Sequence, residues 1–310
     1  MPQVWDTWSE LSVRSQVFRG MRLSRHIFRN SALLLALAGL QLGGCATVVS
    51  NVASNFGDNL SSAILNQDDP ETVRAGMPSY MILMDSFVQG SPDNPAMLGA
   101  AANLYASYGA VFADDETRAS RLTARARDYA LRSICIDYVA ACVWRELNYD
   151  DFVATLDGLD EAHIDAVYQY SFATLMYLRA RTSDWNSLAE LPQAEALLRR
   201  YFELSGDAAK SSAHVYMGVI LTLRPPSLGG KPEEARGHFE KAIAMTGGQD
   251  LGAKVEFAKG YAKLLYEREL HDQLVGEVLD ASPYADGLTL MNVLAQEEAL
   301  KLRADAENYF

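Results

Sequence analysis

Residues 213–248 constrain the fold most, because they read as two helices joined by a connection rich in proline and glycine. An apolar run surrounds Gly218. In the second half, Ala235, Phe239 and Ala242 recur at the spacing of the latter part of a tetratricopeptide repeat. Small alanines let two antiparallel helices approach, and a phenylalanine fills the groove between them. One such pair cannot bury its own apolar face, so we expect neighbouring pairs of the same kind.

The connection between these two helices carries a recognisable motif. Pro225 and Pro226 cannot continue the first helix, and Pro232 suits the first turn of the second. The motif positions of this signature loop are Arg224, Pro225, Leu228, Gly229, Gly230 and Pro232. The motif resembles the corresponding loop of the T-component (TatT) lipoproteins associated with TRAP transporters.

A second stretch, near residue 68, looks like the same family. Asp69, Pro70 and Glu71 give the capping residue, the first-turn proline and the first-turn acid of a helix start. Apolar residues that include Met77, Met81, Met84, Phe87 and Val88 then mark the expected packing face of this helix. The resemblance covers about residues 68–281. It implies an accessory role in solute uptake, a periplasmic solute-binding protein as partner, and a homo-trimer.

Further helical segments extend the pattern along the chain. They are expected at residues 96–112, 119–134, 162–179, 192–204, 251–266 and 270–279, with a capping helix at 288–307. No segment alternates with period two long enough to argue for strands. We therefore predict an all-α fold over residues 67–310, a tetratricopeptide-like array of antiparallel helix pairs of the α-solenoid or bundle type. The resemblance is weakest at residues 134–160.

The amino-terminal end has the layout of a bacterial lipoprotein leader. Arginines at 22, 25 and 29 precede a short apolar run, which ends at Leu-Gly-Gly before Cys45. That run is shorter than the roughly 20 residues needed to span a membrane. The sequence before Cys45 resembles a lipobox, so we expect a signal peptide at 21–44 and a lipid on Cys45; ordinary signal cleavage is the alternative. Residues 1–20 fit no part of a signal, and we expect Met21 to be the true start.

Small and polar residues follow the cysteine, so residues 45–66 are predicted to be a lipidated tether. Ala46 stands where an Asp would resemble an inner-membrane retention signal. The sequence therefore favours a periplasmic protein anchored in the outer membrane over one anchored in the inner membrane.

The charge of the chain excludes some classes of partner. It carries 27 basic and 40 acidic residues, and removing the five arginines and two acids of residues 1–44 leaves 22 and 38, a net charge of −16. Nucleic acids and anionic lipid surfaces are poor partners for such a chain. This acidity suits a self-repelling, soluble surface, or one that steers a basic partner.

Two cysteines in the weakest part of the resemblance leave a disulfide open. In one continuous helix Cys135 and Cys142 would lie about 10 Å apart, which is too far for a bridge. In an oxidising compartment two cysteines this near often pair, but pairing requires the chain to reverse between them. A disulfide and two buried thiols are both retained as interpretations.

Motifs for catalysis and metal binding are not found. Outside the leader, His163, His214, His238 and His271 stand singly in the sequence, and no Gly-x-Ser-x-Gly motif is present. Residues 228–231 superficially suggest a phosphate loop, but Pro232 occupies the place of the required Ser or Thr. We therefore expect neither an enzyme nor a cofactor.

Aromatic and methionine side chains on helical faces are the remaining candidates for a site. Those considered for an apolar ligand cleft are Tyr105, Tyr108, Phe112, Tyr168, Phe172 and Met176. The structural interpretation is that each fills the core between helices. The functional interpretation is that several line a cleft, in which tyrosine hydroxyls add polar contacts and Met adapts to an irregular apolar ligand.

Three functions are compatible with these patterns. The first is an accessory lipoprotein of solute uptake, which binds a solute-binding protein and shelters a small apolar or amphipathic ligand. The second is a scaffold whose helical repeats recruit only protein. The third is a carrier of sterol or fatty-acid type lipids between membranes, which shares the cleft but not the TRAP partner.

Overall fold

The computed structural model describes residues 59–113 and 115–310. Within these ranges the regular secondary structure is helical, and no strand is present. The all-α prediction is confirmed. Residues Ser61–Phe310 form one compact unit. The leader, Cys45 and most of the predicted tether lie outside the described residues, so the expectations for them are untested.

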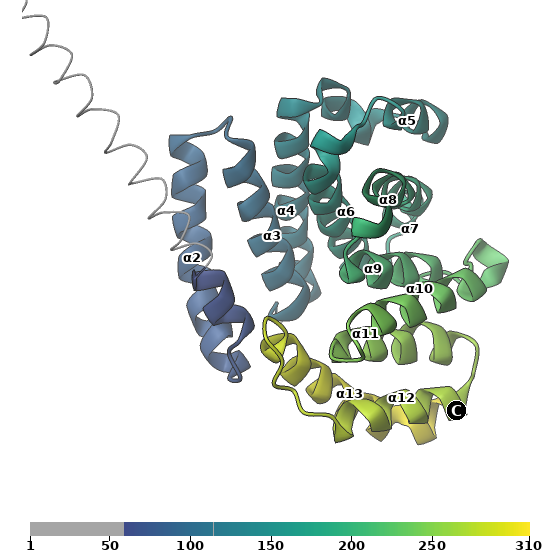
Figure 1. Ribbon diagram of the computed structural model, residues 1–310. Helices are drawn as coiled ribbons and strands as arrows, with labels where there is room; N and C mark the ends of the chain where they lie inside the picture. Colours follow the sequence, from purple (N-terminus) through teal and green to yellow (C-terminus); the bar gives the residue numbers. More distant parts are fainter. Residues whose placement is uncertain (1–58, 114) are drawn as a thin grey trace, which may run out of the picture. The chain divides into compact units, whose positions relative to one another are not determined.

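The α-helices of the unit follow one another with short connections (Figure 1). In chain order they are α2 (Pro70–Gly90), α3 (Pro95–Val111), α4 (Glu116–Asp137), α5 (Tyr149–Leu156), α6 (Ile164–Arg179), α7 (Trp185–Leu188), α8 (Leu191–Ser205), α9 (Ser211–Thr222), α10 (Pro232–Met245), α11 (Leu251–Glu256), α12 (Arg268–Asp280) and α13 (Thr289–Tyr309). Short 3-10 helices lie between some of them, at η1 (Val139–Glu146), η2 (Glu161–His163), η3 (Gly206–Ala208) and η4 (Pro226–Leu228). A π-helical segment, η5 (Phe257–Ala262), follows α11.

Most of the longer helices pack on the helix before or after them in the chain, whereas the short α5 packs on α8 and η1. Helix α3 contacts α2 and α4, α6 lies against α3 and α4, and α8, α9, α10 and α11 continue the series to α12 and α13. Helix α13 also contacts α2, so the last helix returns to the first (Figure 1). At this closure Asn66 accepts a 2.7 Å hydrogen bond from the Gly287 amide, and Tyr284 donates to Asp68 over 3.2 Å.

The helix starts follow the capping residues that the sequence offers. The side chains of Asp69, Asn94 and Asp115 accept backbone hydrogen bonds at the first turns of α2, α3 and α4. Pro70 and Pro95 occupy the first helical positions, where the missing N–H costs nothing. These local choices fix where the first three helices begin.

The pair α9–α10 shows why small residues recur in it. Phe239 is fully buried, and a Cβ added at Gly218 would lie 2.7 Å from its ring. Ala235 and Ala242 are also fully buried on the same helix. Close approach of the two helices thus depends on Gly218 and the alanines, as the sequence predicts. The assignment of the whole array to the tetratricopeptide type stays a prediction.

The segment after α4 reverses direction and holds a disulfide. Helix α4 ends at Asp137, Tyr138 is extended, and η1 begins at Val139. This reversal brings the Cα atoms of Cys135 and Cys142 to 4.8 Å, and the two sulfurs are bonded. Trp144 then packs on Phe152 of α5 and on Tyr170 of α6. Helix α5 was not expected from the sequence.

Candidate functional site

The members of the predicted ligand cleft on α3 and at its C-terminal end belong to the core instead. Tyr105, Tyr108 and Phe112 are only 4%, 2% and 3% exposed. The Tyr105 hydroxyl donates a 2.8 Å hydrogen bond to Asp85 of α2, and burial together with this bond raises the Tyr105 pKa. The prediction that these three line a cleft is therefore corrected, because α2 and α4 cover them.

Asp85 explains how α3 is covered. Besides Tyr105, its carboxylate accepts a 2.8 Å hydrogen bond from Tyr129 of α4 and pairs with Arg125 at 3.2 Å. The Arg125 guanidinium lies 5.1 Å from the Tyr105 ring centre, close enough for a cation–π contact. One carboxylate thus joins three helices.

The α6 members of the predicted cleft have a different environment. Met176 is 6% exposed and also belongs to the core. Tyr168 and Phe172 are half-buried and stack on Tyr216 of α9, with centroid distances of 5.9 and 5.2 Å. Tyr201 of α8 lies 5.4 Å from Tyr168. We call these four residues, Tyr168, Phe172, Tyr201 and Tyr216, the aromatic cluster.

Polar groups fix the aromatic cluster at its hydroxyl end. The Tyr168 and Ser212 hydroxyls are 2.7 Å apart, and the Lys210 ammonium lies 4.2 Å above the Tyr168 ring. Desolvation, strengthened by the nearby Tyr168 hydroxyl, raises the pKa of Tyr216 well above its usual value. The cluster therefore presents hydrogen-bonded phenols beside a phenylalanine, which suits contact with an amphipathic molecule.

One turn beyond Met176, an ion pair closes the same face of α6. Arg179 pairs with Glu256 of α11 at 2.9 Å, and this carboxylate raises the Arg179 pKa. The pair ties α6 to a helix 77 positions further along the chain. Tyr216 and this ion pair were missed from the sequence, since Tyr216 stands within an apolar run that reads as core.

The signature loop borders a groove of about 330 Å³ between α5, α8 and residues 224–231. The groove is lined by Tyr149, Pro192, Glu195, Ala196, Arg199, Arg224, Gly229 and Lys231. A Cβ at Gly230 would lie 1.8 Å from the Arg224 carbonyl oxygen, and Gly229 has a φ of +88°. Both glycines are therefore required by the path of this loop.

Backbone hydrogen bonds hold the loop in place. The Pro225 carbonyl accepts from the Leu228 and Gly230 amides at 2.9 and 3.1 Å, and the Lys231 amide donates to Leu221 at 2.9 Å. Pro232 then begins α10 as the sequence predicts. Leu228 remains 49% exposed at the turn. The predicted motif residues thus form one ordered loop, which lies beside the groove.

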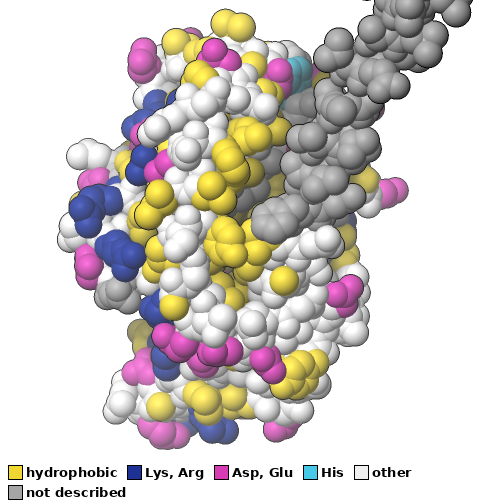
Figure 2. Space-filling view, turned by 90° about the vertical axis from the view of Figure 1, so that its left-hand side faces the viewer, with side chains coloured by type: hydrophobic (Ala, Val, Ile, Leu, Met, Phe, Trp, Pro, Cys, Tyr) yellow, Lys and Arg dark blue, Asp and Glu magenta, His cyan; other side chains and the backbone are white. Residues whose placement is uncertain are grey.

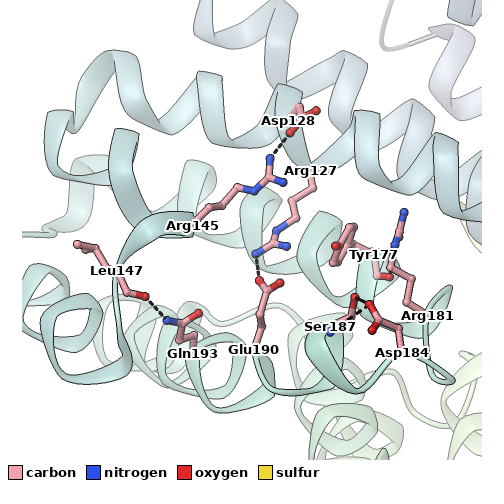
Figure 3. A network of polar contacts seen from close by, with 10 residues as sticks. All are labelled: Arg127, Asp128, Arg145, Leu147, Tyr177, Arg181, Asp184, Ser187, Glu190 and Gln193. Carbon is pink, nitrogen blue, oxygen red and sulfur yellow. Dashed lines mark hydrogen bonds and ion pairs between the residues drawn. The ribbon is translucent and has the colours of Figure 1, made fainter.

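A buried arginine of α4 contacts α6 and the residue that precedes α8 (Figure 3). The Arg127 side chain is only 5% exposed, pairs with Glu190 and lies 4.6 Å from the Tyr177 ring centre. Beside it is a cavity of about 10 Å³, the size of one water molecule, where the Arg127 Nε and the Thr174 hydroxyl lack protein partners. We therefore interpret these residues as stabilising the packing of the helices rather than as forming a ligand site.

Two histidines that stand singly in the sequence meet in space. The Nδ1 atoms of His214 and His238 are 2.8 Å apart, and the Phe202 ring stacks on His214. Burial, followed by the charge of His238, lowers the His214 pKa to about 4. Among the described residues, no group of three His, Cys, Asp or Glu side chains is arranged to hold a metal ion.

The outer face of α2 is apolar and exposed. Ile82, Leu83 and Phe87 are 71%, 43% and 45% exposed, whereas Met77, Met81 and Val88 on the opposite face are buried. The sequence pattern placed Phe87 on the packing face of this helix. That prediction is wrong for Phe87, because its side chain is exposed. Figure 2 shows hydrophobic side chains gathered on this side of the molecule, with Lys and Arg side chains along one border.

These features define the described chain as an all-α protein whose consecutive helices pack in a closed series, with an aromatic cluster on α6, α8 and α9. A family model for the TRAP transporter T-component matches residues 66–310. The chain therefore belongs to the TRAP transporter T-component family. A comparison with the curated proteins found no match. None of the described helices is long and apolar enough to cross a membrane.

Proposed function

We propose that this protein is a periplasmic, lipid-anchored accessory component of TRAP-type solute uptake, which binds a solute-binding protein and shelters a small apolar or amphipathic ligand. Membership of the T-component family carries the proposal, because it associates the chain with TRAP transport. The homo-trimer implied by the family resemblance is part of the proposal, and sedimentation equilibrium of the purified protein tests it.

The aromatic cluster supports the ligand-binding part. Tyr168 and Phe172 are half-buried, so part of each residue stays accessible and can contact a ligand. The stacked rings offer a rigid apolar wall, and the Tyr168 and Ser212 hydroxyls supply polar atoms at one end. An elongated amphipathic molecule matches this combination.

Mass spectrometry of organic extracts tests this part on protein purified from its own cells. The double variant Tyr168→Ala, Phe172→Ala is expected to retain much less of any extracted small molecule, with its helical circular dichroism preserved. Tyr284→Ala is the matched control, because Tyr284 is 68% exposed and lies between α12 and α13. Equal retention by all three proteins assigns the cluster to packing alone.

The outer face of α2 supports the partner-binding part. Three large apolar side chains project from one helix face there, and exposed apolar patches mark interaction surfaces. Ile82→Glu is expected to weaken binding of the purified solute-binding protein that copurifies with the native protein. Val139→Glu is the control, because Val139 is 75% exposed on another element. Undiminished binding by Ile82→Glu places the partner elsewhere.

The lipid anchor and the alternatives are tested separately. Cys45→Ser is expected to release the protein from membranes into the soluble periplasmic fraction, and protein that stays membrane-bound contradicts the anchor. A retained sterol or fatty acid without a solute-binding partner favours the lipid carrier. A protein partner without any retained small molecule favours the scaffold.

A further inference from the structure

The groove beside the signature loop has a charge arrangement that the proposed function does not use. We infer that this groove binds the carboxylate of a small organic acid, with Arg224 as the group that receives it. The inference concerns a second site, since the groove and the aromatic cluster share no lining residue.

The other charges at the groove neutralise one another. Glu195 accepts hydrogen bonds from Lys231 at 2.6 Å and from Arg199 at 2.8 Å. Burial raises the Glu195 pKa, but these two cations lower it more, so the carboxylate is ionised at neutral pH. Arg199 also pairs with Glu234 at 2.6 Å. Two cations and two carboxylates therefore cancel.

Arg224 supplies the positive charge that is left. Among the described residues, none forms a hydrogen bond, ion pair or ring contact with its guanidinium, and its Nε is buried without a partner. This contrasts with the acidic character of the chain, in which carboxylates outnumber cations. A buried Nε–H without an acceptor is unfavourable, and a carboxylate matches the planar donor geometry of the guanidinium with two parallel hydrogen bonds.

The loop holds Arg224 so that its charge is available at the groove. Arg224 follows the end of α9, and Pro225 restricts the backbone immediately after it. A Cβ added at Gly229 would lie 3.9 Å from the guanidinium carbon, so the loop backbone passes close to the charged group. The backbone of Gly229 therefore bounds the guanidinium on one side.

The rest of the lining indicates what the acid carries. Tyr149 at the start of α5 is 49% exposed, and Pro192 and Ala196 on α8 add apolar surface. A volume of about 330 Å³ lies at the small end of ligand pockets, so it suits a compact body. Because the groove carries one unbalanced positive charge, it favours a monocarboxylate with a short aliphatic or aromatic body over inorganic phosphate or a protein segment.

Calorimetric or NMR titration of the purified protein tests the inference with benzoate and hexanoate as probes. We expect both acids to bind, their neutral amides to bind at least about tenfold more weakly, and Arg224→Gln to reduce acid affinity by a similar factor. Arg303→Gln, an exposed arginine on α13, is expected to bind as the unchanged protein does. Tyr149→Ala is expected to weaken the binding of benzoate more than that of hexanoate.

Several results would overturn the inference. They are no binding of either acid, equal binding of the amides, undiminished binding by Arg224→Gln, or saturable binding of acidic peptides or phosphate with no binding of the acids. If Arg224→Gln fails to fold, the comparison of acids with amides and the Tyr149→Ala variant still decide the question. None of these measurements involves the solute-binding partner or the aromatic cluster, so their failure leaves the proposed function standing.

Discussion

Phe239 and Gly218 form the contact on which the α9–α10 pair depends, and a pair of substitutions tests it. Phe239 is fully buried, stacks on Phe257 at a centroid distance of 5.2 Å, and rests directly on Gly218. Because Gly218 and Gly260 beside the ring have no side chains, neither residue can fill the space that Phe239→Ala leaves. We expect Phe239→Ala to cost about 4 kcal/mol of stability, within the range for such core truncations.

Gly218→Ala should change sign with its background. In the unchanged protein the new Cβ would lie 2.7 Å from the Phe239 ring, and overpacking of this kind costs about 1–3 kcal/mol. Once Phe239 is Ala, the same methyl enters the cavity and replaces a glycine inside a helix. There we expect it to stabilise the protein by about 1 kcal/mol.

Chemical denaturation of the four proteins, followed by far-ultraviolet circular dichroism, measures this coupling. The double variant should be more stable than Phe239→Ala alone, with a coupling energy of about 2 kcal/mol or more. If Gly218→Ala costs the same in both backgrounds, or if Phe239→Ala costs less than about 1 kcal/mol, the described contact does not hold the pair together.

Three further predictions concern stability. Glu190→Ala should cost about 3–5 kcal/mol in denaturation experiments, because it leaves the buried Arg127 charge unpaired, and Arg127→Met should cost less; the opposite order would refute the assignment. Replacing both Cys135 and Cys142 by Ser should cost about 2 kcal/mol, since the bridge closes only a short loop, and an unchanged midpoint after reduction would contradict it. The folded-state pKa of His214 is lowered to about 4, so the unfolded chain takes up its proton first and stability should fall from about pH 6.5 towards pH 4. His214→Leu should reduce that fall, and identical pH profiles would show that this histidine is not responsible.

Local sequence patterns predicted much of the helical framework. Capping residues such as Asp69 and first-turn prolines act within one turn, so the starts of α2, α3 and α10 follow from neighbouring residues alone. The packing of α9 on α10 was also accessible, because the spacing of Ala235, Phe239 and Ala242 encodes one helix face. The short helix α5 was missed, since it lies where the family resemblance is weakest and follows a chain reversal.

Most of the charged groove was not accessible in this way. Glu195, the carboxylate at the groove, is already taken up by Lys231 of the loop and Arg199 of α8, so it leaves Arg224 without a partner. His214 and His238 likewise lie on different helices, with no sequence spacing that signals their contact. A motif can identify the loop, but the balance of charges around it appears only when the helices are assembled.

The two halves of the predicted ligand cleft show the same limit most clearly. Tyr105 and Tyr168 have the same chemistry, and each stands on the apolar side of a helix. Asp85 and Arg125 cover Tyr105 from α2 and α4, which bury its ring and bind its hydroxyl. Tyr168 meets Ser212 and the stacked ring of Tyr216 on α9, and it stays half-buried. Helical periodicity selects the face on which a tyrosine lies, but the residues on the facing helices decide whether it remains able to contact a ligand.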